Sequence, residues 1–142
     1  MPIRKANLGD LDSINGLLGY IEGYSKIKEL LAAKFATLLG QEGVYVFLFE
    51  LNTGVIGLAA VQTVFEIGMH KNTMLITYLV VDDRYRNEGV GKRLEQFCNN
   101  FAIEKGCGRI QLHCSSDQTA AHYFYPALGY TESPKFYTKE LE

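Results

Sequence analysis

The sequence predicts an α+β (mixed α/β) fold, in which a mixed, mostly antiparallel sheet is flanked by helices. Residues 44–65 have the pattern of an antiparallel hairpin, two strands joined by turn residues at 52–54. Residues 73–114 have the pattern of a parallel crossover: strand, glycine-containing loop, helix and strand. Since the 142 residues show no repeat or linker, a single domain over residues 1–142 is expected.

The chain before the hairpin is expected to contain one short strand, Ile3–Ala6, and two helices. Apolar residues recur at three- and four-residue steps over residues 11–21, behind capping residues at 7–10. A second helix is expected to begin at a Ser25 cap and to stop at Gly40. Its apolar face comprises Ile27, Leu31, Phe35 and Leu38.

The later elements follow from the same periodicities. The expected strands are Val44–Phe49, Val55–Phe65, Thr73–Val81, Arg109–Cys114 and a final edge strand, Lys135–Leu141. A long helix follows the loop at 82–91 and ends at Gly106. A short helix, capped by Asp117, runs through about Tyr125.

The composition excludes several classes of protein. Fourteen Lys and Arg residues stand against 16 Asp and Glu, and no basic block is present, so nucleic-acid binding is not expected. The longest apolar run, Val44–Phe49, is far shorter than the roughly 20 residues of a membrane span. Residues 1–5 lack the apolar stretch of a signal peptide. We therefore expect a cytoplasmic protein with no membrane association.

The cysteine and histidine residues indicate no metal site. The cysteines are odd in number and have no C-x-x-C spacing, so free, partly buried thiols are expected. They are Cys98, Cys107 and Cys114. The three histidines are not at metal-ligand spacing.

The loop at 82–91 carries the strongest chemical signal. The helix that follows it begins with unpaired backbone N–H groups and a partial positive charge. Gly89 and Gly91 carry no Cβ atom, which lets an anion approach these groups. Arg86 and Lys92 add cations at the rim. The pattern predicts a cradle for a phosphate or pyrophosphate.

The glycine spacing distinguishes between kinds of cradle. It does not fit a P-loop, G-x-x-x-x-G-K-[ST]. A Rossmann loop needs a third glycine, where Leu94 stands, and prefers the first β-α-β unit. The segment Arg86–Gly91 matches R-x-x-G-x-G instead. One helix and one strand later, Ala121-His122-Tyr123-Phe124-Tyr125 precedes Leu128-Gly129-Tyr130.

These two segments together closely resemble the GCN5-related N-acetyltransferase (GNAT) family. The strand Leu79-Val80-Val81 and the loop are similar to its acetyl-CoA signature, and the later segment to A-H-x-F-Y-x-x-L-G-[FY]. The resemblance covers residues 73–130 well, and the order of elements extends it over the whole chain. It implies the GNAT acyl-CoA N-acyltransferase fold and acetyl-CoA (coenzyme A) as co-substrate, without a metal.

The resemblance also implies where acetyl-CoA lies. In this family two long strands splay apart and the pantetheine arm pairs with the main chain, here at Leu79 and Val81. A backbone N–H near Leu79 or Val80 would polarise the thioester carbonyl. The N–H groups from Asn87 to Lys92 would hold the pyrophosphate. The residues assigned to cofactor binding are Leu79, Val80, Val81, Arg86, Asn87, Glu88, Gly89, Val90, Gly91 and Lys92.

By the same resemblance Tyr125 is the catalytic residue, a general acid that protonates the leaving thiolate. The alternative role is packing on a helix face. Pro126 follows directly, and a residue before proline is pushed away from helical geometry, so the helix is expected to end or kink there. Tyr123 is the alternative phenol.

The general base stays open. Many relatives carry a Glu in the strand just before L-V-V, where this chain has Thr77 and Tyr78. Glu66, Glu22 or Asp82 could act through a water, but the pattern favours a solvated surface charge for each of the three.

The resemblance predicts an acetyl-CoA-dependent N-acetyltransferase whose acceptor is a primary amine of a small molecule, such as a polyamine, amino acid or aminoglycoside. The acceptor itself is not readable from the sequence. The alternative is a non-catalytic acyl-CoA-binding sensor module of the same fold, and a dinucleotide-binding domain is a remote third reading. The edge strand at Lys135–Leu141 would allow pairing with a second copy, so a homodimer is expected.

Overall fold

The computed structural model describes residues 2–21, 30, 32–112, 119–132 and 137–141. The chain divides into two compact units, Met1–Leu112 and His113–Glu142. The predicted Ser25 cap and Asp117 cap, the candidate base Glu22, and Cys114 lie outside the described residues.

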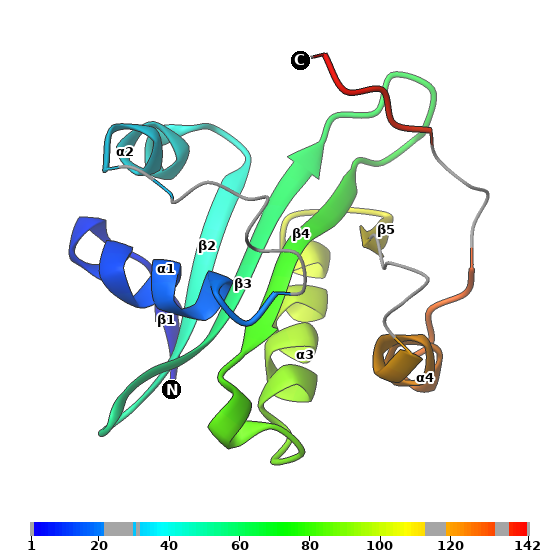
Figure 1. Ribbon diagram of the computed structural model, residues 1–142. Coiled ribbons are helices and arrows are strands. Elements are labelled where there is room, and N and C mark those ends of the chain that lie inside the picture. Colours follow the sequence, from blue (N-terminus) through cyan, green and yellow to red (C-terminus); the bar gives the residue numbers. More distant parts are fainter. Residues whose placement is uncertain (1, 22–29, 31, 113–118, 133–136, 142) are drawn as a thin grey trace. The chain divides into compact units, whose positions relative to one another are not determined.

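The first unit contains a five-stranded sheet (Figure 1). In sheet order the strands are β1 (Ile3–Lys5), β2 (Val44–Leu51), β3 (Gly54–Val64), β4 (Thr73–Val81) and β5 (Arg109–Leu112). The first three pairings are antiparallel and the β4–β5 pairing is parallel. The predicted mixed, mostly antiparallel sheet is confirmed.

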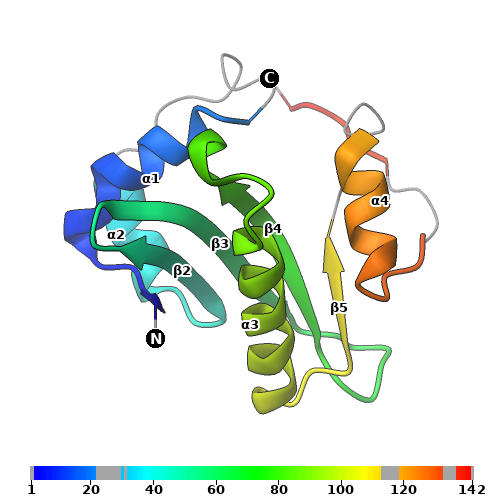
Figure 2. The same ribbon diagram turned by 90° about the horizontal axis from the view of Figure 1, so that it is seen from below.

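Helices cover both faces of the sheet, and each face has its own apolar core (Figures 1 and 2). On one face lies α3 (Val90–Glu104), whose side chains pack on β2, β3 and β4. On the other face lie α1 (Leu11–Leu18) and α2 (Ala32–Gly40), which contribute four buried side chains. These are Ile14, Leu17, Leu18 and Phe35.

The first helix is shorter than predicted. Asn7 caps a 3-10 turn, η1 (Leu8–Asp10), in a capping box, as the capping signal indicated. α1 then ends at Leu18 instead of reaching residue 21. Gly19 follows it, and glycine is a poor helix former because its unfolded backbone has more freedom to lose.

The second unit contains α4 (Thr119–Ala127). Pro126 lies inside it, one residue before its end, so the helix continues past Tyr125 by two residues. The expectation of a final strand at Lys135–Leu141 is wrong for its described part, since Tyr137–Leu141 form no strand. Tyr137 and Leu141 are almost fully exposed and bury no apolar face that would stabilise a strand.

Candidate active site

The two halves of β4 have different neighbours. Thr73–Ile76 pair in parallel with Arg109–Leu112 of β5 and antiparallel with β3. From Thr77 to Val81 the strand keeps β3 as its partner, and no described residue pairs with its other edge. Figure 2 shows β4 and β5 diverging towards their carboxyl ends. Among the described residues, the end of β4 therefore has one backbone edge without a strand partner.

A β-bulge lies where the open half begins. Ala60 pairs with Tyr78, and its neighbour Val61 pairs with Ile76, so Thr77 is an extra residue on β4. The Thr77 hydroxyl donates to the Ala60 carbonyl over 3.0 Å. A hydroxyl side chain thus bonds to the partner strand at the point where the ladder is interrupted.

The bulge reverses which side chains face α3. Before it, Met74 and Ile76 are buried in the core under α3. After it, Leu79 and Val81 pack against that core, whereas Val80 is buried under α1 and α2. One extra residue shifts the two-residue alternation of the strand by one step.

The open half presents backbone groups to its free edge. The Asp82 N–H donates to the Ile56 carbonyl over 2.8 Å, towards β3. Because successive N–H groups of a strand point to opposite edges, the Val80 N–H also points to β3. The N–H groups of Leu79 and Val81 then point to the edge that β5 leaves open. These are the two residues that the resemblance assigned to pairing with the pantetheine arm.

A buried carboxylate controls the turn that leaves β4. Asp82 is 4% exposed and caps the 3-10 turn η3 (Asp83–Tyr85) through the Arg84 N–H at 2.9 Å. The Arg84 guanidinium donates to both of its carboxylate oxygens, at 3.2 and 2.8 Å, and the Tyr20 hydroxyl donates over 3.2 Å. The hydrogen bonds from Arg84 lower the pKa of Asp82 from 3.8 to about 2.

The next residues join the turn to its surroundings. The Tyr85 hydroxyl lies 3.1 Å from the Thr53 hydroxyl on the β2–β3 hairpin. Arg86 forms an ion pair with Asp83, with 2.8 Å between Nη2 and Oδ1, and both side chains are more than half exposed. The predicted cation at the rim is therefore present, but a neighbouring carboxylate partly neutralises it.

The loop reaches α3 through two left-handed residues, Asn87 (φ 64°) and Gly89 (φ 81°). Asparagine and glycine are the residues that adopt this conformation most readily. Gly89 is the N-cap, and the first intrahelical bond joins the Arg93 N–H to its carbonyl, at 3.0 Å. The N–H groups of residues 90–92 precede this bond and have no acceptor within the helix.

The space before the helix is open. A Cβ atom at Gly89 would meet no atom within 4 Å. The side chains of Asn87, Glu88 and Lys92 are exposed around it, and Val90 is buried below. Backbone N–H groups at the positive end of a helix, with an exposed lysine beside them, fit an anion such as a pyrophosphate.

Gly57 on β3 holds the start of α3 close to the sheet. A Cβ atom there would lie 2.9 Å from Leu94 Cδ1 and 3.3 Å from Val90 Cγ1. Sequence reasoning did not single out this glycine. Its signal was available, because an isolated glycine inside a strand pattern indicates a close approach. The bulge at Thr77 and the Tyr20–Asp82 contact had no such signal.

The second unit holds the predicted general acid. Tyr125 is half-buried on α4, and its ring packs edge-on against Phe124 at 5.0 Å and Tyr130 at 5.6 Å. Tyr123 is 76% exposed. The structure thus gives Tyr125 defined ring neighbours.

Two of the candidate bases already have partners. Asp82 is held by Arg84 and Tyr20, as described above. Glu66 forms an ion pair with Arg109, 3.3 Å apart, and Arg109 also donates to the Thr73 hydroxyl. A carboxylate whose pKa is about 2 is a weak base, so Asp82 is a poor acceptor for an ammonium proton.

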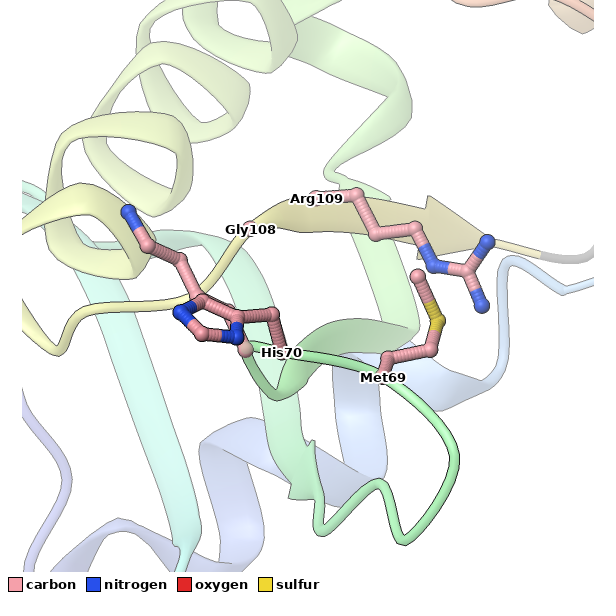
Figure 3. A pocket seen from close by; sticks show the side chains of 5 residues that line it. Met69, His70, Gly108 and Arg109 are labelled. Atoms are coloured by element: carbon pink, nitrogen blue, oxygen red, sulfur yellow. The ribbon is translucent and has the colours of Figure 1, made fainter.

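A shallow cavity of about 250 Å³ lies at the other end of β4, lined by Met69, His70, Lys71, Gly108 and Arg109. In Figure 3 Met69 and Arg109 point towards one another, whereas His70 lies apart from them. Since it adjoins the first residue of β4, this cavity is not part of the open half.

Two of the three cysteines lie in the described residues and are free thiols, as predicted. Cys98 is a buried free thiol whose pKa burial raises to about 12, and Cys107 is a half-buried free thiol. Within the described residues no three His, Cys, Asp or Glu side chains gather where they could hold a metal ion. No helix in the described part of the chain has the length and apolar character needed to cross a membrane.

Comparison with known proteins decides the family. A family model described as the acetyltransferase (GNAT) family matches residues 17–130, most of the chain. The chain belongs to the GNAT acetyltransferase family. The GNAT match includes the open half of β4, the cradle and α4. No curated protein matches the sequence significantly.

Solved structures share the GNAT fold over nearly the full length. A transcriptional regulator from Bacillus halodurans C-125 is 20% identical, with a TM-score of 0.90 and 98% of each chain covered. A Trypanosoma brucei acetyltransferase is 24% identical, with a TM-score of 0.82 and 98% of each chain covered. An aminoglycoside acetyltransferase from an uncultured soil metagenomic sample, solved with sisomicin, is 22% identical, with a TM-score of 0.82. That match covers 99% of this chain and 95% of the other.

Proposed function

We propose that this GNAT protein transfers an acetyl group from acetyl-CoA to a primary amine of a small molecule, by direct attack on the thioester. One observation supports this most strongly: within residues 79–92 the open edge of β4 is followed, after one short turn, by the start of α3, which has no side-chain cap. An open strand edge suits the amides of a pantetheine arm, and a helix start suits a diphosphate.

The Leu79 N–H is the favoured group to polarise the thioester carbonyl. The alternation of backbone N–H groups along β4 directs it to the open edge and directs the Val80 N–H to β3. A donor fixed in a strand stabilises developing negative charge without having to reorganise. Val80 then acts through its side chain, which lies in the core under α1 and α2.

Tyr125 is the proposed general acid. The neutral amine nitrogen bonds to the carbonyl carbon, the carbon–sulfur bond breaks and the thiolate takes the Tyr125 proton. The nitrogen sheds one proton as it becomes the amide, and that proton restores the Tyr125 phenol through solvent. The ring contacts with Phe124 and Tyr130 support a fixed orientation of the phenol. The amine must arrive neutral although a lysine-like amine has a pKa of about 10.4 in water. We propose that the amine loses its proton to bulk solvent before it binds, because Asp82 and Glu66 are engaged by arginines.

The acceptor is proposed to be a small molecule, and the protein is proposed to act in the cytoplasm. We propose that the reaction needs no metal and that the protein binds neither nucleic acid nor membrane. An aminoglycoside is a reasonable first choice, because a structure of the same fold is an aminoglycoside acetyltransferase solved with sisomicin. Polyamines and amino acids are the other classes to test. A homodimer remains a proposal, although the described part of its expected edge strand is not a strand.

The test is a thiol-release assay with acetyl-CoA over a panel of aminoglycosides, polyamines and amino acids. We expect at least one amine to release free coenzyme A above the hydrolysis background. Tyr125→Phe should then lower turnover about 100-fold while coenzyme affinity stays the same. Tyr123→Phe, the matched control, should keep wild-type turnover. Turnover of Tyr125→Phe within twofold of wild type would assign Tyr125 to packing.

A second candidate function is a non-catalytic acyl-CoA sensor of the same fold. Two observations favour it: Thr77 and Tyr78 stand where many relatives carry a Glu, and a structure of the same fold is a transcriptional regulator. A sensor would bind acetyl-CoA in a calorimetric titration yet release no thiol with any amine of the panel.

A further inference from the structure

The carboxylate of Asp82 is a meeting point of three parts of the first unit. It lies directly after the open half of β4, it caps the η3 turn, and it accepts a hydrogen bond from Tyr20 beyond α1. At 4% exposed, it accepts four hydrogen bonds, from Tyr20 and from three N–H groups of Arg84. A buried carboxylate with this many donors holds one orientation, because leaving any donor unpaired is costly.

Tyr20 is held by α1. Its backbone N–H donates to the Leu17 carbonyl over 3.0 Å, and Leu17 is itself buried in the core under α1 and α2. Val80, from the open half of β4, lies in that same core. The end of α1 and the end of β4 are therefore joined twice, by the apolar contact between α1 and β4 and by the hydrogen bond from the Tyr20 hydroxyl to Asp82.

The segment after Asp82 has few other anchors. Residues 86–89 are exposed, and two of them are left-handed. On the far side the chain is fixed by Val90, which is buried against β3. On the near side it is fixed by the Asp82 cluster and by the contact between the Tyr85 and Thr53 hydroxyls. The direction in which the chain leaves η3 therefore helps to set where the N–H groups of the cradle point.

We propose that Tyr20 is a positioning residue of the coenzyme site: its hydroxyl orients the Asp82 carboxylate, and through it the turn that enters the pyrophosphate cradle. The ligand named here rests on the proposed function. The link implies that α1 and the cradle are coupled, so that a change at the end of α1 alters coenzyme affinity although Tyr20 is not among the residues proposed to bind the coenzyme.

The test uses Tyr20→Phe, which removes only the hydroxyl. We expect it to weaken binding of coenzyme A about threefold to tenfold in calorimetry, which is less than the loss of a full hydrogen bond to a charged group because Tyr20 acts on the coenzyme indirectly. In the free protein, amide exchange over residues 83–89 should become faster. Tyr45→Phe is the matched control, because Tyr45 packs on Phe101 near the other end of α3, and it should leave both readouts unchanged.

A double-mutant cycle separates positioning from general stability. Asp82→Asn should also weaken binding, and adding Tyr20→Phe to it should cost little more, because the two residues act through one contact. Unchanged affinity and exchange in Tyr20→Phe, or equal losses in Tyr45→Phe, would overturn the proposal. Failure of the wild type to bind coenzyme A would instead remove the proposed function, and the exchange experiment would still decide whether Tyr20 orders the turn.

Discussion

The first and second halves of β4 belong to one strand but differ in how their backbones are paired. Thr73–Ile76 are paired on both edges, and their side chains are almost all buried. After the bulge at Thr77, Tyr78–Val81 pair with β3 on one edge and with no described residue on the other. The apolar residues of both halves predict a buried strand. The difference is in the backbone. The first half pairs with neighbouring strands along both of its edges, and the second half has one edge that could pair with a ligand.

The largest expected difference between the halves is in stability. Met74 is fully buried, so Met74→Ala should lower the free energy of unfolding by about 2–5 kcal/mol. Leu79 is only partly buried, and Leu79→Ala should cost roughly 1–2 kcal/mol. Urea denaturation measures both. Equal losses would mean that the open half is as much a part of the core as the paired half.

The next comparison concerns the helix that follows the open half. Gly89 and Gly106, at opposite ends of α3, both have left-handed backbones and open space where a Cβ would lie. Alanine at either position should cost roughly 1–2 kcal/mol of stability from the same strain. Only Gly89→Ala should weaken coenzyme A binding, by at least about tenfold, or about 1.4 kcal/mol, in calorimetry. A similar loss in Gly106→Ala would assign the effect to strain in the helix.

The smallest expected effect is the acid sensitivity of the turn after the open half. The pKa of Asp82 is lowered to about 2 from 3.8, so its contribution to stability is complete above about pH 4 and is lost as the pH falls towards 2. The stability difference between wild type and Asp82→Asn should therefore shrink over this range. Asp83→Asn is the control, because its ion pair with Arg86 is exposed and screened by solvent. A difference that stays constant with pH would contradict a stabilising contact between the buried Asp82 carboxylate and the exposed Arg84 guanidinium.

Much of the fold could be predicted because it follows from local patterns. The turn lies between β2 and β3 as predicted, with β2 ending two residues later and β3 beginning one residue earlier than expected, and the glycine loop precedes α3 as expected. The final strand failed because alternation alone does not make a strand when no apolar face is buried. Likewise Gly19 ended α1 early, although the apolar spacing continued to Ile21.

The site was only partly predictable. The glycine pair indicated the candidate cradle in the sequence, because the anion-binding groups of such a cradle are backbone N–H groups of one short segment. The open edge of β4 depends on how far along β4 the pairing with β5 extends. The apolar residues of β4 do not show which strands pair with it or over what length. The bulge at Thr77 and the contact between Tyr20 and Asp82 join residues 17 and 62 positions apart in the chain, Thr77 with Ala60 and Tyr20 with Asp82. No local periodicity encodes such pairs.

The most direct test of the open edge is residue-resolved amide hydrogen exchange with and without coenzyme A. Coenzyme A should slow exchange at Leu79, at Val81 and across residues 89–92, and leave Thr73–Ile76, already paired on both edges, unchanged. Saturation with coenzyme A that protects other amides and leaves Leu79 and Val81 exchanging as in the free protein would contradict the account.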